Sequence, residues 1–265
     1  MVGRKKKRTR SKSSLGNYQR NWIWGRHAVM ESLRANQWLP EELHLAPEIL
    51  DSSILNEVIR RAKSSGIDFQ EATAESLTQL CHARDHQGLV ARMPEFPYCS
   101  LDILDAPSND KQRFALVLDR IQDPFNFGSI LRSADLFGVS TVLIGEREQV
   151  GVTSHVARSS AGAVNFLNIC RVPNLCEASQ RLLATDYQLI AATEKSSTPP
   201  SQIDFRSNTA IVIGNEGTGI DPDLLNLATQ TCAIPQSGHI DSLNAAVAAG
   251  ILCYEVARQR THADP

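Results

Sequence analysis

Residues 114–145, "FALVLDRIQDPFNFGSILRSADLFGVSTVLIG", contain two short apolar runs separated by a stretch with helical character. Apolar runs of this length, rich in β-branched and aromatic residues, are typical of buried strands. Two strands joined through a helix lie parallel in one sheet. This stretch therefore predicts an α/β fold whose parallel sheet is covered by helices on both faces.

The same alternation continues to the end of the chain. Further strands are expected at residues 164–170, 187–193, 209–214 and 231–235, and helices at 154–163, 174–186, 222–228 and 242–260. Ligands bind such sheets at the carboxyl ends of the strands. We therefore look for a site in the loops that follow the strands.

A smaller α/β unit precedes this sheet. Its helices are expected at residues 22–35 (entered through Gly25), 54–66 and 75–81, and its strands at 42–48, 67–72 and 88–93. A segment rich in proline and polar residues then marks a linker. The expected organisation is a small domain at residues 21–96, a linker at 97–112 and a larger domain at 113–262.

The first 20 residues are strongly basic. Lys and Arg hold seven of the positions from 4 to 12 with no acidic residue among them, which leaves 20 of the 27 basic residues against 29 acidic ones. No apolar stretch follows that would make a signal peptide. We expect residues 1–20 to be a disordered arm that contacts nucleic acid, with a merely solubilising tail as the alternative.

The composition is that of a globular protein without a membrane span. The chain of 265 residues is 42% hydrophobic and 21% charged. No apolar run approaches the roughly 18 residues that a span requires. Six cysteines lie far apart without a CxxC pair, in a chain too large to need disulfide staples. We therefore expect reduced thiols and a cytoplasmic location.

Two polar residues stand out where the helix of the opening stretch begins. Asp123 and Pro124 signal a turn, and the helix is expected to run from Ser129 to Phe137. Across a turn and a helix start, Asn126 and Arg132 are expected to face one cleft above the sheet. The simpler interpretation makes Asn126 an N-cap and Arg132 a surface arginine.

A second polar feature follows the strand expected near residue 211. Three glycines in "IVIGNEGTGID", residues 211–221, permit positive φ angles or close approach of the backbone to a ligand. The turn lacks the Lys-Ser or Lys-Thr of a Walker loop and is not a GxGxxG motif. A structural turn explains the glycines, but it does not explain Glu216, a carboxylate at the end of so apolar a strand.

The last helix begins beside a third polar feature. Ser242 is a suitable N-cap, and the residues that follow it to Cys253 are apolar on nearly all sides. This helix is therefore expected to be buried in the core or against another subunit. Asn244 would lie in its first turn and face the same cleft as Asn126 and Glu216.

The histidines do not predict a metal site. His82 and His86 are four residues apart with Asp85 between them, a spacing that two metal ligands on a helix can have. Gly88 and the short strand after it favour a loop instead. No metal is expected, and His155 and His239 are isolated.

Taken in order, three motifs resemble those of the SpoU (TrmH) family of RNA ribose 2'-O-methyltransferases. They are "DPFNFGSILRSADLFGV", "IVIGNEGTGI" and "IPQSGHIDSLNAAVAAGILCYE". The segments "WGRHAVMESLRA" and "HQGLVAR" resemble the small RNA-substrate-binding domain of the RlmB branch, which methylates a guanosine of large-subunit ribosomal RNA. The resemblance covers residues 23–260.

The resemblance implies more than periodicity could show. It implies the SPOUT class, with a deep trefoil knot in the C-terminal domain and a homodimer whose active site forms near the subunit interface, although knots are rare. S-adenosylmethionine is the implied cofactor and RNA the implied partner. The implied cofactor-binding residues are Gly214, Asn215, Gly217, Ile234 and Leu243, and the implied catalytic residues are Asn126, Arg132, Glu216, Ser242 and Asn244.

The chemistry explains these residue types. A ribose hydroxyl is a poor nucleophile near neutral pH, so its attack on a sulfonium methyl needs proton removal or strong orientation. The resemblance assigns Arg132 to activate the hydroxyl, yet a guanidinium is effectively always protonated. We therefore expect Arg132, held by Glu216 or an RNA phosphate, to position the oxygen and stabilise negative charge. Asn126 would orient Arg132 or the ribose, while Ser242 and Asn244 would fix the loop over the cofactor.

The sequence departs from the family pattern at two places. Ala245 and Ala246 stand where the family commonly has Val-Ser, and Phe125 and Phe127 flank Asn126 where His or Leu is frequent. The second difference alters the surroundings of the ribose pocket. Both differences bear on substrate identity more than on activity.

Three other functions are alternatives to a ribosomal RNA methyltransferase. A transfer RNA substrate is the main rival within the enzyme class. A binding-only role, as in ribosome assembly, is disfavoured by the complete polar set. An NAD-dependent enzyme lacks the glycine fingerprint after the first strand and an acid about 20 residues later.

Overall fold

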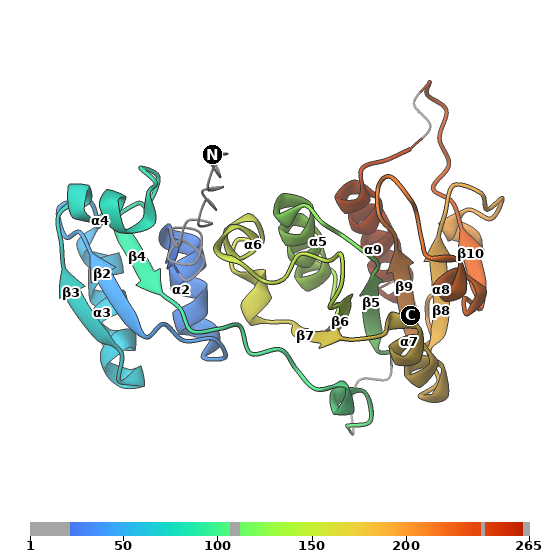
Figure 1. Ribbon diagram of the computed structural model, residues 1–265, viewed down its shortest axis with the longest axis horizontal. Coiled ribbons are helices and arrows are strands. Elements are labelled where there is room, and N and C mark those ends of the chain that lie inside the picture. The colour runs from blue at the N-terminus through green and yellow to red at the C-terminus, as the bar shows by residue number, and fades with distance from the viewer. Residues whose placement is uncertain (1–21, 107–111, 240–241, 262–265) are drawn as a thin grey trace, which may run out of the picture.

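Two sheets organise the chain (Figure 1). The computed structural model describes residues 22–106, 112–239 and 242–261. Within them, a four-stranded mixed sheet precedes a six-stranded parallel sheet, and the segment between them runs along one side of the molecule (Figure 1). The expected basic arm at residues 1–20 lies outside the described residues.

The described part of the small unit around the first sheet consists of four strands and three helices. They are β1 (Trp22–Trp24), α2 (Arg26–Ala35), β2 (Glu42–Leu45), α3 (Ser52–Ser65), β3 (Asp68–Glu71), α4 (Ala74–Cys81) and β4 (Leu89–Arg92). The strand order is β1-β4-β2-β3, with β2 and β3 parallel and the other pairs antiparallel. Buried residues of α2 and α3 pack on one face, and those of α4 pack on the other.

The prediction of a helix from Trp22 is wrong for its first three residues. Trp22–Trp24 form a strand that pairs with β4, and α2 begins only at Arg26. Gly25 separates the two with a φ angle of 96°, which other residues rarely adopt. Ile23 packs on one face of the sheet and the two tryptophans on the other, a period of two that a helix cannot provide.

The second sheet begins after the 3-10 helix η2 (Leu101–Leu104). Its strands are β5 (Phe114–Leu118), β6 (Thr141–Gly145), β7 (Asn168–Val172), β8 (Gln188–Ala192), β9 (Thr209–Ile213) and β10 (Gln230–Cys232). Its helices are α5 (Pro124–Leu136), α6 (Ser154–Ser159), α7 (Leu175–Ala184), α8 (Pro222–Asn226) and α9 (Ala245–Thr261), with 3-10 helices η3 (Ala163–Asn165) and η4 (Pro200–Gln202).

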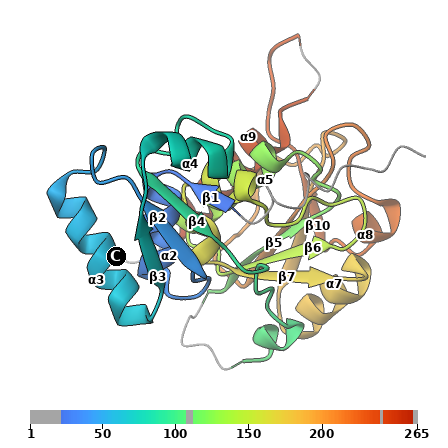
Figure 2. The ribbon, with the colours of Figure 1, turned by 60° about the vertical axis from the view of Figure 1, so that its left-hand side comes forward.

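This sheet confirms the predicted architecture. The strand order is β10-β8-β9-β5-β6-β7 (Figure 1), and every described pair is parallel. Figure 2 shows β5, β6 and β7 side by side. Along β5, Leu116 and Leu118 pack with α5, α6 and α9, whereas Ala115 and Val117 pack with α7 and α8. Both faces are therefore covered, and the central strands β5 and β9 are almost wholly apolar because neither of their faces meets water, whereas the edge strands β7 and β10 carry exposed Arg171 and Gln230.

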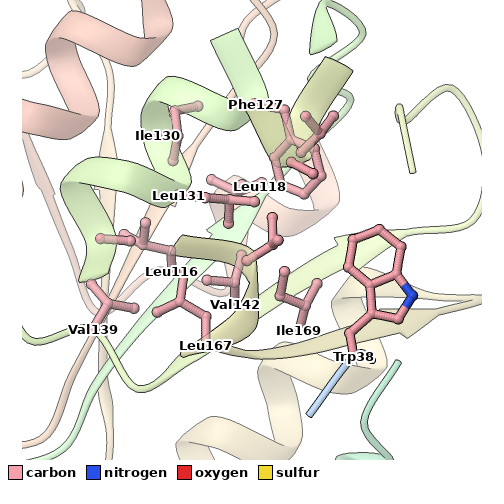
Figure 3. Packing of buried hydrophobic residues seen from close by; sticks show 14 of the residues in the cluster. Trp38, Leu116, Leu118, Phe127, Ile130, Leu131, Val139, Val142, Leu167 and Ile169 are labelled. Carbon is pink, nitrogen blue, oxygen red and sulfur yellow. The ribbon is translucent and has the colours of Figure 1, made fainter. Parts of the chain in front are cut away.

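The core continues from the large sheet into the small unit. Phe127, Ile130 and Leu131 of α5 pack against Leu116 and Leu118 (Figure 3). Trp38 of the small unit joins the same cluster beside Ile169 of β7 (Figure 3). The two sheets consequently share one contiguous hydrophobic core.

The helix that carries the first motif begins earlier than expected. α5 starts at Pro124 rather than Ser129, because the Asp123 side chain accepts hydrogen bonds from the main-chain N–H groups of Phe125 and Asn126. Asp123 is thus the N-cap, and Asn126 is not. Gly128 lies inside the helix, where a Cβ atom would sit 1.8 Å from Ser159 Oγ, so this glycine permits close packing of α5 on α6.

The last helix also differs at its start. The Asn244 side chain accepts hydrogen bonds from the main-chain N–H groups of Ala246 and Val247 at 2.9 and 3.3 Å, so Asn244 and not Ser242 is the N-cap of α9. Residues 164 and 165, expected in a strand, belong to η3 because the Asn165 side chain bonds back to the Gly162 carbonyl.

α9 follows the edge strand β10 in the chain, but it packs against α5, the helix between β5 and β6. The trefoil knot that the resemblance implies stays a prediction.

All six cysteines are free. In the described part of the chain, no helix has the length and hydrophobicity of a membrane span.

Candidate active site

The candidate site lies at the carboxyl ends of β5 and β9, which are neighbours in the sheet. From this pair, β6 and β7 extend to one side and β8 and β10 to the other. Loops that leave neighbouring strands in opposite directions open a crevice, where ligands bind in α/β folds. The first two motifs of the sequence occupy these two loops.

The glycine turn after β9 is closed by its own backbone. Asn215 and Gly219 exchange main-chain hydrogen bonds at 3.1 and 2.9 Å, and Asn215 Oδ1 accepts from the N–H of Gly217 at 2.8 Å. A Cβ atom at Gly214 would lie 2.5 Å from main-chain atoms of Gly219 and Ile220. Gly214 is therefore required for the turn to fold back on the strand end.

Asp119 and Arg120 brace this turn, a role that the sequence did not reveal. Asp119 is buried at the end of β5, pairs with Arg120 at 2.9 Å and accepts a hydrogen bond from the Asp221 N–H at 2.7 Å. Arg120, with a φ angle of 58°, donates to the Gly219 carbonyl. The signal available was a charged pair directly after five apolar strand residues.

Three of the predicted polar residues meet in one hydrogen-bonded cluster. Glu216 Oε1 accepts from Asn126 Nδ2 at 2.6 Å, from Asn244 Nδ2 at 2.7 Å and from the Ala245 N–H at 3.3 Å. Asn244 Nδ2 also donates to Asn126 Oδ1 at 3.1 Å. The starts of α5 and α9 and the glycine turn are thus joined through one carboxylate oxygen, and we call Asn126, Glu216 and Asn244 the amide–carboxylate cluster.

Arg132 does not join this cluster within one chain. It follows Asn126 by six residues of one helix, which is about 240° of rotation and roughly 9 Å of rise. The side chain is exposed and forms no hydrogen bond or ion pair with the described residues. The expectation that both residues face one cleft assumed a turn between them, and α5 has none.

A cavity of about 730 Å³ lies next to the cluster. The segments after β8, β9 and β10 line it together with the start of α9. All five predicted cofactor-binding residues belong to its lining: Gly214, Asn215, Gly217, Ile234 and Leu243. Ser242 and Glu216, predicted as catalytic residues, line it as well. Burial raises the pKa of the Cys232 thiol, also in the lining, to about 11, so this cysteine is neutral near pH 7.

Among the described residues, no group of three or more His, Cys, Asp and Glu side chains could hold a metal ion. His86 is buried, with Nδ1 accepting from the Gly88 N–H at 3.1 Å and Nε2 lying 3.2 Å from Thr78 Oγ1. His82 ends α4 in the left-handed conformation. The two histidines therefore have structural explanations.

The fold and this site define an α/β protein with a ligand cavity closed by a glycine turn at the carboxyl ends of parallel strands. The chain belongs to the SpoU rRNA Methylase family, whose profile matches residues 113–254. Residues 22–99 match a second family, described as RNA 2'-O ribose methyltransferase substrate binding. The family expected from the three motifs is confirmed.

Similar proteins agree over nearly the whole chain. The TrmH family protein YacO of Bacillus subtilis is 33% identical over 91% of this chain and 97% of its own. The crystal structure of the SpoU methyltransferase AviRb from Streptomyces viridochromogenes, in complex with AdoMet, superposes with a TM-score of 0.77 at 25% identity over 96% of this chain and 95% of AviRb.

Two further structures differ in how much of the chain they match. An AdoMet-bound rRNA methyltransferase from Sinorhizobium meliloti is 26% identical, with a TM-score of 0.77, over 92% of this chain and 88% of its own. The TrmH/SpoU tRNA modifying enzyme of A. aeolicus is also 26% identical, but with a TM-score of 0.52 over only 61% of this chain and 80% of its own.

Proposed function

We propose that this protein transfers a methyl group from S-adenosylmethionine to a ribose 2'-hydroxyl of RNA, with a guanosine of large-subunit ribosomal RNA as the target. The observation that carries the proposal is the amide–carboxylate cluster, which adjoins the 730 Å³ cavity through Glu216. In this proposal, residues 21–96 bind RNA, 97–112 are a linker, 113–262 form the catalytic domain, and the basic arm at 1–20 contacts RNA phosphates.

The cavity suits S-adenosylmethionine. Small-ligand pockets measure about 300–1,000 Å³ and combine apolar walls with a few placed polar groups. Here the glycine turn offers main-chain groups at Gly214, Asn215 and Gly217, and Ile234 and Leu243 offer apolar contact. When bound, the cofactor supplies an electrophilic methyl group on a sulfonium. AviRb and the Sinorhizobium enzyme, both crystallised with AdoMet, support this choice.

The cluster is suited to hold a ribose. Glu216 Oε1 is occupied by three N–H donors, whereas Oε2 has no hydrogen-bond partner among the described residues. Oε2 is thus free to accept a hydrogen bond from a ribose hydroxyl. One of the two hydrogens on Asn126 Nδ2 remains for the substrate, because the other is donated to Glu216 and the Oδ1 atom accepts from Asn244. Such fixed groups hold the hydroxyl in line with the methyl group, and Ser242 in the cavity wall keeps the loop over the cofactor.

The small domain favours ribosomal RNA over transfer RNA. The rRNA methyltransferase of Sinorhizobium matches 92% of this chain, whereas the tRNA modifying enzyme matches 61%. Residues 22–99 are the part that matches a substrate-binding family. The description of YacO covers both tRNA and rRNA. Transfer RNA therefore remains the second candidate.

We also propose a homodimer. Val247, Ile251 and Tyr254 form an exposed apolar stripe along α9, and Leu136 of α5, which is 70% exposed, adds to the apolar surface of these two packed helices. Arg132 lies one helical turn before Leu136 and does not reach the cluster of its own chain. A second copy packed on this surface would cover the stripe and give Arg132 a place at the interface.

The test of the activity is incorporation of tritiated methyl groups into unmethylated ribosomal RNA and, separately, transfer RNA. Incorporation into large-subunit RNA, mapped to one nucleotide by comparing cells with and without the gene, is the expected result. Incorporation into transfer RNA alone would replace the substrate. RNA binding without any incorporation would favour a non-catalytic assembly factor.

Arg132→Ala is expected to abolish methyl transfer and to leave cofactor affinity unchanged, because Arg132 lies outside the cavity lining. Arg132→Lys keeps the charge but loses the planar fork of donors, so partial activity is expected. Methyl-transfer rates and calorimetric cofactor titration check both. Loss of cofactor binding in Arg132→Ala would contradict the positioning role.

A further inference from the structure

Phe125 is an aromatic residue without a structural task. Its ring is 61% exposed at the start of α5, although Asp123 and Pro124 already begin that helix. Phe127, two residues later, is fully buried in the core. A phenyl ring this exposed adds little to the stability of the core, so its face is free to contact a ligand.

A second exposed ring lies beside it. The centroids of Phe125 and His155 are 6.0 Å apart, with the ring planes inclined by 50°. His155 belongs to the first turn of α6 and is itself exposed. Two aromatic rings therefore meet the solvent side by side, one from each of two packed helices.

The pair is held from the small domain. The Trp24 ring lies 6.0 Å from His155 in an edge-to-face arrangement, and the Arg158 guanidinium covers Trp24 at 4.3 Å. Asp85 accepts a hydrogen bond from Trp24 Nε1 at 3.0 Å and pairs with Arg158. These contacts connect His155 to the small domain through the ring of Trp24.

Phe125 directly precedes Asn126 of the amide–carboxylate cluster in the first turn of α5. Its neighbour Asn126 donates to Glu216, which lines the cavity. A continuous line of contacts thus leads from the cavity through Glu216, Asn126, Phe125 and His155 to the small domain. The two rings are thus linked by contacts to both the small domain and the cavity, and they are exposed to RNA that binds at both places.

We infer that Phe125 and His155 form a stacking platform for the base of the methylated nucleotide. The inference rests on the proposed function, since the ribose held by Asn126 carries that base. Sequence-specific RNA binding relies on unstacked bases that lie against aromatic side chains. The exposed phenyl face of Phe125 offers such a surface, and His155, whose ring plane is inclined by 50°, flanks the base from the side.

The test compares Phe125→Ala, Phe125→Leu and Phe125→Trp in the full-length protein. We measure KM and kcat for methyl transfer, and RNA affinity by filter binding to in vitro transcribed large-subunit ribosomal RNA at elevated salt, which suppresses non-specific phosphate contacts. Loss of one base–aromatic stack is expected to weaken binding by roughly 10- to 100-fold in the Ala and Leu variants. The Trp variant should bind as the wild type does, and its added fluorescence should be quenched by RNA.

Cofactor affinity, melting temperature and oligomeric state should be unchanged in all three variants. Phe166→Ala, which removes another exposed ring (47%), is the matched control and should bind RNA normally. Equal RNA affinity of Phe125→Leu and wild type would overturn stacking in favour of simple apolar contact. A change of oligomeric state in Phe125→Ala would overturn it in favour of a subunit contact.

Failure of the proposed function gives a different result. If the wild type binds RNA but transfers no methyl group, the proposed methyltransferase activity is contradicted. The ratio of RNA dissociation constants between Phe125→Ala and wild type still decides the stacking platform, since it does not depend on turnover.

Discussion

Glu216 connects the two halves of the candidate site. One of its oxygens holds the starts of two helices far apart in sequence, and its backbone belongs to the turn that lines the cavity. Under the proposed function, this single carboxylate would couple the place of the ribose to the place of the cofactor. This is the smallest scale at which the function can be tested.

Glu216→Ala is expected to reduce methyl transfer by about 10- to 100-fold, because hydrogen bonds to a charged group contribute about 1.5–3 kcal/mol. Glu216→Gln keeps an acceptor oxygen for the two amides but replaces a carboxylate oxygen by a donor, so a smaller loss is expected. Single-turnover rates at saturating cofactor measure both. Equal losses in the two variants would contradict a role for the acceptor oxygen.

At the scale of elements, the packing of α5 on α6 sets where the first motif stands. Gly128 lets the two helices approach, and Ser159 Oγ reaches across to the Pro124 carbonyl at 3.2 Å. The same approach brings the Phe125 and His155 rings together. A shift of either helix would therefore move both the cluster and the stacking platform.

Gly128→Ala is expected to destabilise the protein by about 1–3 kcal/mol, as overpacking of a tight contact does. Ser159→Gly in the same chain removes the clashing side chain and should recover part of this loss. Urea unfolding of the four variants of this cycle gives the coupling between the sites. If Gly128→Ala costs the same with and without Ser159→Gly, the clash is not its cause.

At the scale of the whole molecule, a junction between the two units and an exposed apolar surface bear on assembly. One is the junction of the two units through Trp24, Asp85 and Arg158. The other is the exposed apolar stripe of α9, on the helix pair that carries Arg132. The first positions the small domain, and the second is where a further copy of the chain would pack.

Acid is expected to weaken the junction. Burial raises the pKa of Asp85, but hydrogen bonds from Trp24 and Arg158 outweigh it, and the pKa falls below the ordinary 3.8. A carboxylate with a lowered pKa stabilises the folded state above its unfolded pKa and loses this effect as the pH falls through the folded value. The stability difference between wild type and Asp85→Asn should therefore be present at neutral pH and shrink below about pH 4.

Urea unfolding at several pH values measures this difference. Asp68→Asn removes an exposed carboxylate that forms no ion pair among the described contacts and serves as control. A stability difference for Asp85→Asn that does not change between pH 7 and acid would be inconsistent with a charged junction.

Ile251→Glu is expected to shift a dimer toward monomer, since it places a charge in the apolar stripe. Ile49→Glu is the matched control, because both side chains are 40% exposed. Sedimentation velocity measures the change. A monomeric wild type would refute the dimer.

Mixing two impaired variants tests whether the copies share a site. If Arg132 of one copy serves the cluster of the other, a mixture of Arg132→Ala and Glu216→Ala should exceed the residual activity of Glu216→Ala alone, because each mixed dimer holds one complete site. No recovery from mixed dimers would place both residues in the same chain's site.

Much of this protein follows from local sequence. The strands are recognisable because buried parallel strands need continuous apolar runs, and the three motifs are recognisable because Asn126, Glu216 and Asn244 are polar residues after a strand or at the start of an apolar helix. The starts of elements were less predictable. Trp22–Trp24 form a strand because they pair with β4, which is distant in the chain, whereas Asn244 caps α9 through nearby N–H groups that Ser242 was expected to meet.

Tertiary structure alone decided which of these residues meet. Asn126 and Asn244 are 118 positions apart, yet both donate to one oxygen of Glu216, which lies 90 positions after Asn126. They meet because β5 and β9 are neighbours, and no periodicity specifies strand order. The same folding separates Arg132 from Asn126, since a continuous helix turns residues six apart to different sides. It also brings Phe125 to His155, two isolated residues in the sequence that become one surface only when α5 packs on α6.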